Sequence, residues 1–127
     1  MKKSLLIIAI FLVLAGMLVN TGCKSNKLDL SGVWFIETIL EGNTFSESYT
    51  FAGDDRGGDV LFQGQVLGTY SASGDSISFT LEYFDQDDDY TVEVYQGSMD
   101  TDDQMSGNFT YSVEGFATLS GTFVGIR

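Results

Sequence analysis

From residue 31 to the end of the chain, apolar and polar residues alternate with a period of two, and short breaks interrupt the alternation. This period is typical of β-strands that are buried on one face, whereas an amphipathic helix repeats every three or four residues. The chain also contains no proline, which suits a fold made mostly of paired strands. We expect strands in eight runs, which are residues 31–40, 44–52, 59–63, 66–73, 76–84, 90–98, 104–113 and 117–126.

The breaks between these runs are short and rich in Gly, Asp and Asn. Short connections join antiparallel neighbours, because a parallel crossover needs about a dozen residues. A series of such connections makes a meander, and a meander whose first and last strands pair has no exposed edge. The sequence therefore predicts an all-β fold, a single eight-stranded antiparallel up-and-down (meander) barrel over residues 30–127. Eight strands enclose an interior that side chains fill, or that holds one small ligand.

The alternation also predicts which side chains face the interior. On the run 90–98 it places Val92 and Val94 inside, with Thr91 and Glu93 outside. The bulky residues expected inside the barrel are Trp34, Ile36, Phe45, Tyr49, Phe51, Phe62, Tyr70, Ile77, Phe79, Leu81, Tyr83, Met105, Phe109, Tyr111, Val113 and Phe123. These are many rings for a narrow barrel, which favours a mostly filled interior.

Four strands repeat one pattern, in which a glycine lies two residues after an apolar residue and two before an aromatic one. The glycines are Gly32, Gly68, Gly107 and Gly121. Glycine permits the sharp bend that a small barrel needs, and a nearby ring covers the bare backbone. We interpret these positions as barrel-building residues rather than as a binding site.

The first residues differ in character, because Lys2 and Lys3 precede an uncharged apolar run over residues 4–19. Such a run suits a secretory signal, and a run of about 18 apolar residues also suits a membrane-spanning helix. The residues that follow decide between them. The sequence Asn20-Thr21-Gly22-Cys23 resembles the lipobox of bacterial lipoproteins, with Asn20 in place of the usual apolar residue.

This resemblance implies cleavage before Cys23 and acylation of its thiol, by palmitate for example, and of the new amino group. Residues 1–22 would then be a helical signal peptide, and residues 23–29 a lipid-anchored tether. The membrane would be the partner of this anchor, and the cell envelope, at the outer membrane, the location. Cys23 is the sole cysteine, so the chain forms no internal disulfide.

The charge balance is strongly acidic, with 18 Asp and Glu against 6 Lys and Arg. This balance argues against nucleic acid and against anionic membrane surfaces as partners, because both are bound by clusters of Lys and Arg. One interpretation is solubility through self-repulsion, and the other is a cationic or basic partner.

The sequence offers little for catalysis. The chain has no histidine, so a Ser-His-Asp triad is impossible, and Cys23 is assigned to lipid. We therefore predict no enzyme, no catalytic residues and no cofactor. The acidic run Asp85–Asp89 departs from a calcium loop, because Tyr90 and Gln96 stand where Gly and Glu are needed. We interpret it as a solvated turn and assign no metal, with weak surface calcium binding as the alternative.

The run Gly32-Val33-Trp34 resembles the Gly-x-Trp motif of lipocalins, and the ending 120–127 resembles the last strand of bacterial lipocalin-like domains. The resemblance spans residues 30–127 and implies that Arg127 stacks on Trp34 and plugs the closed end of the barrel. Unlike classical lipocalins, the chain has no long loops and no helix after the barrel. Streptavidin-like barrels share the motif, but they line the biotin site with several Trp, and this chain has one.

Glu47 shares its strand parity with inward aromatic residues, although a buried carboxylate is costly unless it is paired. It lies at the barrel mouth, or a bulge turns it outward, or it orients a ligand. The candidate ligand-binding residues are Glu47, Tyr49, Tyr70, Tyr83 and Tyr111. Any cavity should open opposite Trp34 and Arg127, with a rim made of turns 41–43, 64–65, 85–89 and 114–116.

The carboxylates of this rim disfavour anions and favour neutral or cationic molecules. The leading hypothesis is a lipid-anchored envelope lipoprotein with a lipocalin-like barrel that binds a small neutral or cationic apolar molecule. The alternative is a structural or protein-interaction surface barrel with a filled core and no small ligand.

Overall fold

The computed structural model describes residues 29–127, so the expected signal peptide and Cys23 lie outside the described residues. Every regular element in this part of the chain is a β-strand. The strands are β1 (Gly32–Leu40), β2 (Asn43–Gly53), β3 (Gly57–Phe62), β4 (Gln65–Ser73), β5 (Ser76–Phe84), β6 (Tyr90–Thr101), β7 (Gln104–Val113) and β8 (Leu119–Ile126). Over residues 29–127 there is no helix long and apolar enough to cross a membrane.

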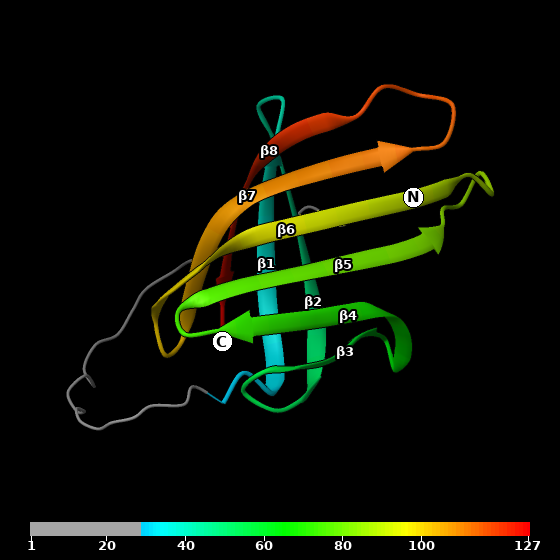
Figure 1. Ribbon diagram of the computed structural model, residues 1–127. Helices are drawn as coiled ribbons and strands as arrows, with labels where there is room; N and C mark the ends of the chain where they lie inside the picture. The colour runs from blue at the N-terminus through cyan, green and yellow to red at the C-terminus, as the bar shows by residue number, and fades with distance from the viewer. Residues whose placement is uncertain (1–28) are drawn as a thin grey trace.

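Each strand pairs antiparallel with the next, and β1 also pairs with β8, which closes the barrel (Figure 1). This confirms the predicted meander. The start of β1, the end of β8 and the turns β2–β3, β4–β5 and β6–β7 share one end of the barrel, called the closed end below. The four other turns form the opposite, open end. Because closure pairs every strand on both sides within the described residues, we expect this part of the chain to fold on its own.

The strand bounds differ from the expected runs mainly at the closed end. Strand β3 begins at Gly57 rather than at Asp59, and β6 continues to Thr101 rather than stopping at Ser98. A Cβ atom on Gly58 would lie 2.2 Å from the carbonyl oxygen of Ala52. Glycine therefore allows β2 and β3 to pair inside a stretch that its composition marks as a turn.

The expected orientation of β6 is wrong. Glu93 and Tyr95 are fully buried, whereas Val92 and Val94 are only partly buried. The register explains this, because Tyr95 pairs with Phe79 on the inner face of β5, and parity then brings Glu93 inside as well. Valine is found on either face of a strand, so Val92 and Val94 indicate the orientation of β6 less clearly than Tyr95 does.

Stacked and edge-to-face rings fill the closed half of the barrel. Phe79 and Tyr95 stack with 4.2 Å between ring centroids, and the ring of Phe123 meets both edge-on. Glycines let neighbouring strands approach one another closely: a Cβ on Gly68 would lie 1.7 Å from Thr80 O. The same close approach holds at Gly107 and Gly121, whereas a Cβ on Gly32 would meet open space. At three of the four repeated glycines, a side chain would therefore clash with the backbone of the neighbouring strand.

Trp34 and Arg127 seal the closed end, and their predicted contact is confirmed. Trp34 is fully buried, and its Nε1 donates a hydrogen bond to Leu30 O at 2.9 Å. The guanidinium carbon of Arg127 lies 4.7 Å from the Trp34 ring centroid. The same guanidinium donates to the carbonyl oxygens of Asp29 at 2.7 Å and Asp102 at 2.8 Å. Arg127 thereby ties the segment before β1 to the β6–β7 turn.

We expect Trp34→Ala to lower the free energy of unfolding by about 3–5 kcal/mol, the range for emptying a large buried aromatic site. Trp34→Phe keeps most of the ring and should lose clearly less. Chemical denaturation of residues 24–127, followed by circular dichroism, measures both variants. An unchanged midpoint in Trp34→Ala would show that the ring does not seal the barrel.

Candidate functional site

A cleft of about 550 Å³ opens on the side of the barrel at its open end. It is built by β2, β3, β4, β5 and the turns that join β3 to β4 and β5 to β6. The residues that line it are Glu47, Tyr49, Phe62, Gln65, Val66, Leu67, Glu82, Tyr83, Phe84, Asp85 and Gln86. The cleft lies at the end opposite Trp34 and Arg127, where the sequence analysis placed a mouth.

A bulge between β3 and β4 shapes one wall of the cleft. Val60 pairs with Gly68 and Leu61 with Val66, so Leu67 is the extra residue of the bulged strand. Such a residue bends its strand and increases the local twist. The hairpin beyond it turns through Gln63 and Gly64, which both have positive φ. The bent hairpin thus contributes Phe62 and Leu67 to an apolar wall, in which the rings of Phe62 and Tyr49 lie 5.7 Å apart.

The charged groups of the cleft are carboxylates. Glu47, Glu82 and Asp85 line it, and no Lys or Arg from residues 29–127 does. Glu82 accepts a hydrogen bond from the hydroxyl of Tyr90 at 2.6 Å. The two glutamines, Gln65 and Gln86, are the amides of the lining. Among the described residues the cleft therefore combines an apolar wall with a negative field.

A buried carboxylate lies in the barrel interior next to this cleft. Glu93 is fully buried, and one of its oxygens accepts a hydrogen bond from Tyr95 at 2.6 Å. Its other oxygen accepts a hydrogen bond from Tyr83, which itself lines the cleft. Phenol donors satisfy the carboxylate inside the barrel, where an unpaired charge would be costly. Tyr83 thereby connects the cleft to the Glu93 side chain.

The surroundings keep these phenols protonated. Burial raises the pKa of Tyr83 far above its ordinary value of 10.0, and the negative charge of Glu93 adds to this effect. Burial, followed by the charge of Glu93, likewise raises the pKa of Tyr95 and of Tyr49. The tyrosines therefore act as hydrogen-bond donors throughout the physiological pH range.

The structure distributes the candidate ligand residues unevenly. Glu47, Tyr49 and Tyr83 line the cleft. Tyr111 does not line it and packs against Phe109 in the interior, with ring centroids 6.5 Å apart. Tyr70 belongs to the closed half, where its hydroxyl donates to Asp54 O at 2.6 Å. Sequence reasoning missed Glu93, although the aromatic Tyr95 two residues later could have indicated its inward parity.

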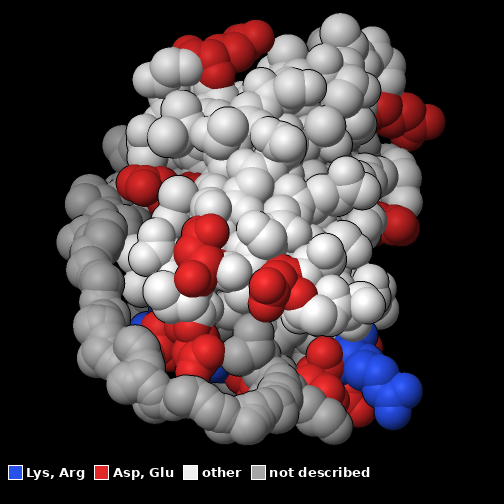
Figure 2. Space-filling model, turned by 60° about the vertical axis from the view of Figure 1, so that its left-hand side comes forward, with Lys and Arg blue, Asp and Glu red and all other residues white. Residues whose placement is uncertain are grey.

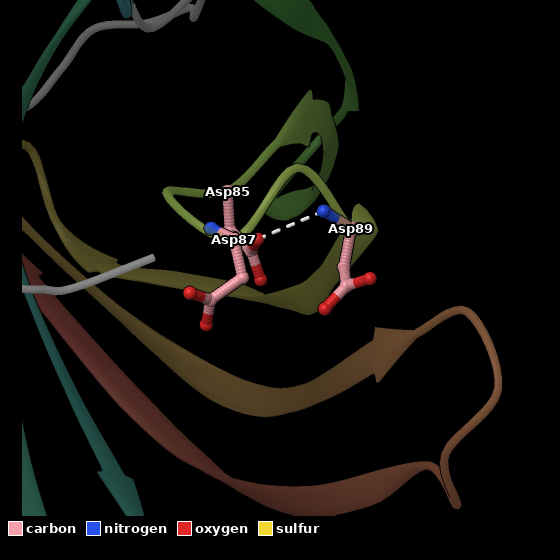
Figure 3. Close-up of side chains that lie close together, drawn as sticks. All are labelled: Asp85, Asp87 and Asp89. Carbon is pink, nitrogen blue, oxygen red and sulfur yellow. Dashed lines mark hydrogen bonds between the residues drawn. The ribbon is translucent and has the colours of Figure 1, made fainter.

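The acidic turn at the rim is held by its own first residue. One carboxylate oxygen of Asp85 accepts hydrogen bonds from the backbone N–H groups of Asp87 and Asp89, both at 2.9 Å. These bonds, the one from Asp89 above all, lower the pKa of Asp85. The three carboxylates lie within 4.8 Å of one another and point to one side of the turn (Figure 3). These bonds form an Asx turn, which is a sufficient reason for an aspartate at position 85 even if no metal binds there.

The charge is distributed unevenly between the two ends of the barrel. Residues 29–127 contain all 18 acidic residues of the chain but only two basic ones, Arg56 and Arg127. Both arginines lie at the closed end, Arg56 in the β2–β3 turn and Arg127 after β8. Figure 2 shows acidic side chains spread over one face and basic ones only along its lower edge. The open end therefore carries carboxylates and, in the part of the chain that the structure describes, no arginine or lysine.

Comparison with known proteins finds one similar fold and identifies no family. No family model matches the chain, and no curated protein matches it. A solved structure of EF1p2_mFAP2b bound to DFHBI is similar in fold, with a TM-score of 0.60. The match covers 77% of this chain and 93% of that one, at 17% sequence identity. The class defined by fold and site is a small closed antiparallel barrel with a cleft at one end, which fits the expected lipocalin-like architecture.

Alkaline pH should destabilise this barrel through its buried tyrosines. Their pKa values are raised on folding, so the folded state holds phenol protons that the unfolded state releases above about pH 10. The associated stability is complete below that pH and declines as the pH rises through it. We expect the free energy of unfolding to fall above pH 10, and to fall less in Glu93→Gln, which lacks the repelling charge.

Denaturation midpoints measured between neutral pH and pH 11 test this expectation, with tyrosinate absorbance following ionisation directly. Tyrosines that all ionise near pH 10 while the barrel stays folded would contradict the buried network.

Proposed function

We propose that the barrel binds a small apolar molecule, neutral or cationic, in the cleft at its open end. The observation that carries the proposal is the cleft itself, whose lining combines apolar side chains with three carboxylates. Ligand sites commonly have this composition, a mostly apolar lining with a few polar groups that fix orientation. The volume of about 550 Å³ suits a molecule of modest size.

The structural neighbour supports this proposal at the level of the fold. A barrel of the same architecture was solved bound to DFHBI, so this fold can hold a small molecule. In the present chain, packed rings fill the closed half of the interior. A ligand would therefore occupy the open half only. The filled half also suits the alternative, a structural or protein-interaction barrel, and a binding measurement decides between them.

Binding should depend on the shape of the cleft. Leu67→Trp places a large ring in the wall and should weaken the binding of a neutral apolar dye about tenfold or more, a cost of about 1.4 kcal/mol. Val33→Trp is the matched control, because Val33 lies on β1, outside the cleft, and is 50% exposed. Dye fluorescence with residues 24–127 at low salt measures both variants.

The same titration should be made with a fatty acid and with a cationic amphiphile. The negative lining predicts binding of the neutral and cationic probes and rejection of the fatty acid. Absence of binding by all three would favour the filled structural barrel, and tight binding of the fatty acid would contradict the electrostatic argument.

We further propose that the protein is a lipid-anchored envelope lipoprotein, located at the outer membrane. This proposal rests on the sequence, where an apolar run follows Lys2 and Lys3 and Gly22 precedes the sole cysteine. Anchoring through Cys23 would hold the barrel at a membrane surface by residues 24–29.

Cys23→Ser should abolish labelling by a radioactive fatty acid in cells and release the barrel from the membrane fraction. Met17→Ser is a control within the apolar run, because it leaves the cysteine in place. A Cys23→Ser protein that still sediments with membranes at full length would show that residues 1–22 are an uncleaved anchor.

A further inference from the structure

We infer that the cleft recognises an ammonium group that bears N–H donors, carried on an apolar tail, and that Glu47 and Tyr83 receive it. This inference rests on the proposed function, because it specifies the ligand class of the same cleft. Three features support it: the hydrogen-bonding capacity of the lining, the distribution of charge and the placement of the rings.

The hydrogen-bonding capacity of the lining is biased toward acceptors. A phenol has one hydrogen to donate, and that of Tyr83 is donated to Glu93. Toward the cleft, the oxygen of Tyr83 therefore accepts. Glu47, Glu82 and Asp85 are acceptors as well. The donors of the lining are the two glutamine amides and the phenol of the buried Tyr49. A ligand rich in donors fits this set better than a ligand rich in acceptors.

Charge favours the same ligand. Both arginines of the described barrel lie at the closed end, so neither lies beside the cleft to attract an anion. Tyr49 lines the cleft and is close enough to Glu47 and Glu93 for both charges to raise its pKa. The carboxylate of Glu93 also polarises Tyr83, which strengthens the phenol oxygen as an acceptor for a cation. An anionic head group would meet repulsion at the same place.

The aromatic rings of the lining also suit an ammonium ligand with an apolar tail. Two rings line the cleft, the buried Tyr49 and the partly buried Phe62, with centroids 5.7 Å apart, and aromatic rings attract cations. Val66, Leu67 and Phe84 continue the wall toward the rim, and Phe84 is 66% exposed. An ammonium placed near Glu47 and Tyr83 would direct its apolar tail along this wall. The predicted ligand class is thus a small primary or secondary aliphatic amine.

Four probes with one octyl tail test this inference by calorimetry on residues 24–127: octylamine, octanol, octanoate and octyltrimethylammonium. Octylamine is protonated near neutral pH, like a lysine side chain. We expect it to bind about tenfold tighter than octanol, the effect of one charge-assisted hydrogen bond. Octyltrimethylammonium carries the charge without an N–H donor and should bind more weakly than octylamine. Octanoate should bind least.

Two variants locate the ammonium. Glu47→Gln should weaken octylamine about tenfold and leave octanol unchanged. Tyr83→Phe should weaken octylamine several-fold in the same selective way, since it removes an acceptor. Glu41→Gln is the control, because it removes a carboxylate from the β1–β2 turn at the same end but outside the cleft. It should change neither affinity.

The outcomes separate this inference from the proposed function. If octanol or octyltrimethylammonium binds as tightly as octylamine, the ammonium inference is overturned while the apolar binding site stands. If Glu41→Gln weakens octylamine as much as Glu47→Gln does, diffuse charge rather than the cleft carboxylate selects the ligand, which also overturns it. If none of the four probes binds, both proposals fail.

Discussion

The pairing of β1 with β8 is the constraint on which the rest of the structure depends. Closure removes both sheet edges, and it also fixes which end of the barrel is sealed. Arg127 follows the last strand directly, so closure brings its guanidinium over Trp34 and against the carbonyl oxygens of Asp29 and Ser31. Because the chain forms no internal disulfide, these contacts hold the segment before β1 against the end of β8.

The sealed end determines where a ligand has room. Rings from neighbouring strands meet in the closed half, with Tyr95 stacked on Phe79 and Phe109 beside it. Next to this layer the interior contains a carboxylate, because the next inward residue of β6 is Glu93. Its carboxylate is held by two phenols, one of which reaches the cleft. Tyr83, which helps to satisfy this buried carboxylate, therefore also adds an acceptor to the cleft.

Much of this fold could be predicted from the sequence. Period-two alternation and short turns predicted the eight strands and the meander, because both properties are local. The resemblance of two motifs to lipocalins implied the contact between Trp34 and Arg127. The orientation of β6 could not be predicted in the same way. Val92 and Val94 fit the alternation as inward residues, but the cross-strand register with β5 places Glu93 and Tyr95 on the inner face instead.

The candidate site was harder to predict than the fold. Glu47 was identified from its parity. Of the four turns expected at the rim, 64–65 and 85–89 contribute to the cleft, whereas 41–43 and 114–116 do not line it. Glu93 was missed, because a carboxylate is assigned to the outside unless its partners are known, and Tyr83 and Tyr95 become its partners only through packing. Leu67 reaches the cleft through a bulge, which has no clear pattern in the sequence.

A crystal structure of residues 24–127 with octylamine would test the central claim most directly. The account predicts the ligand nitrogen within hydrogen-bonding distance of Glu47 and of the Tyr83 hydroxyl oxygen, with the tail along Phe62 and Leu67. Octylamine bound on the outer face of the barrel, with the cleft unchanged, would contradict it.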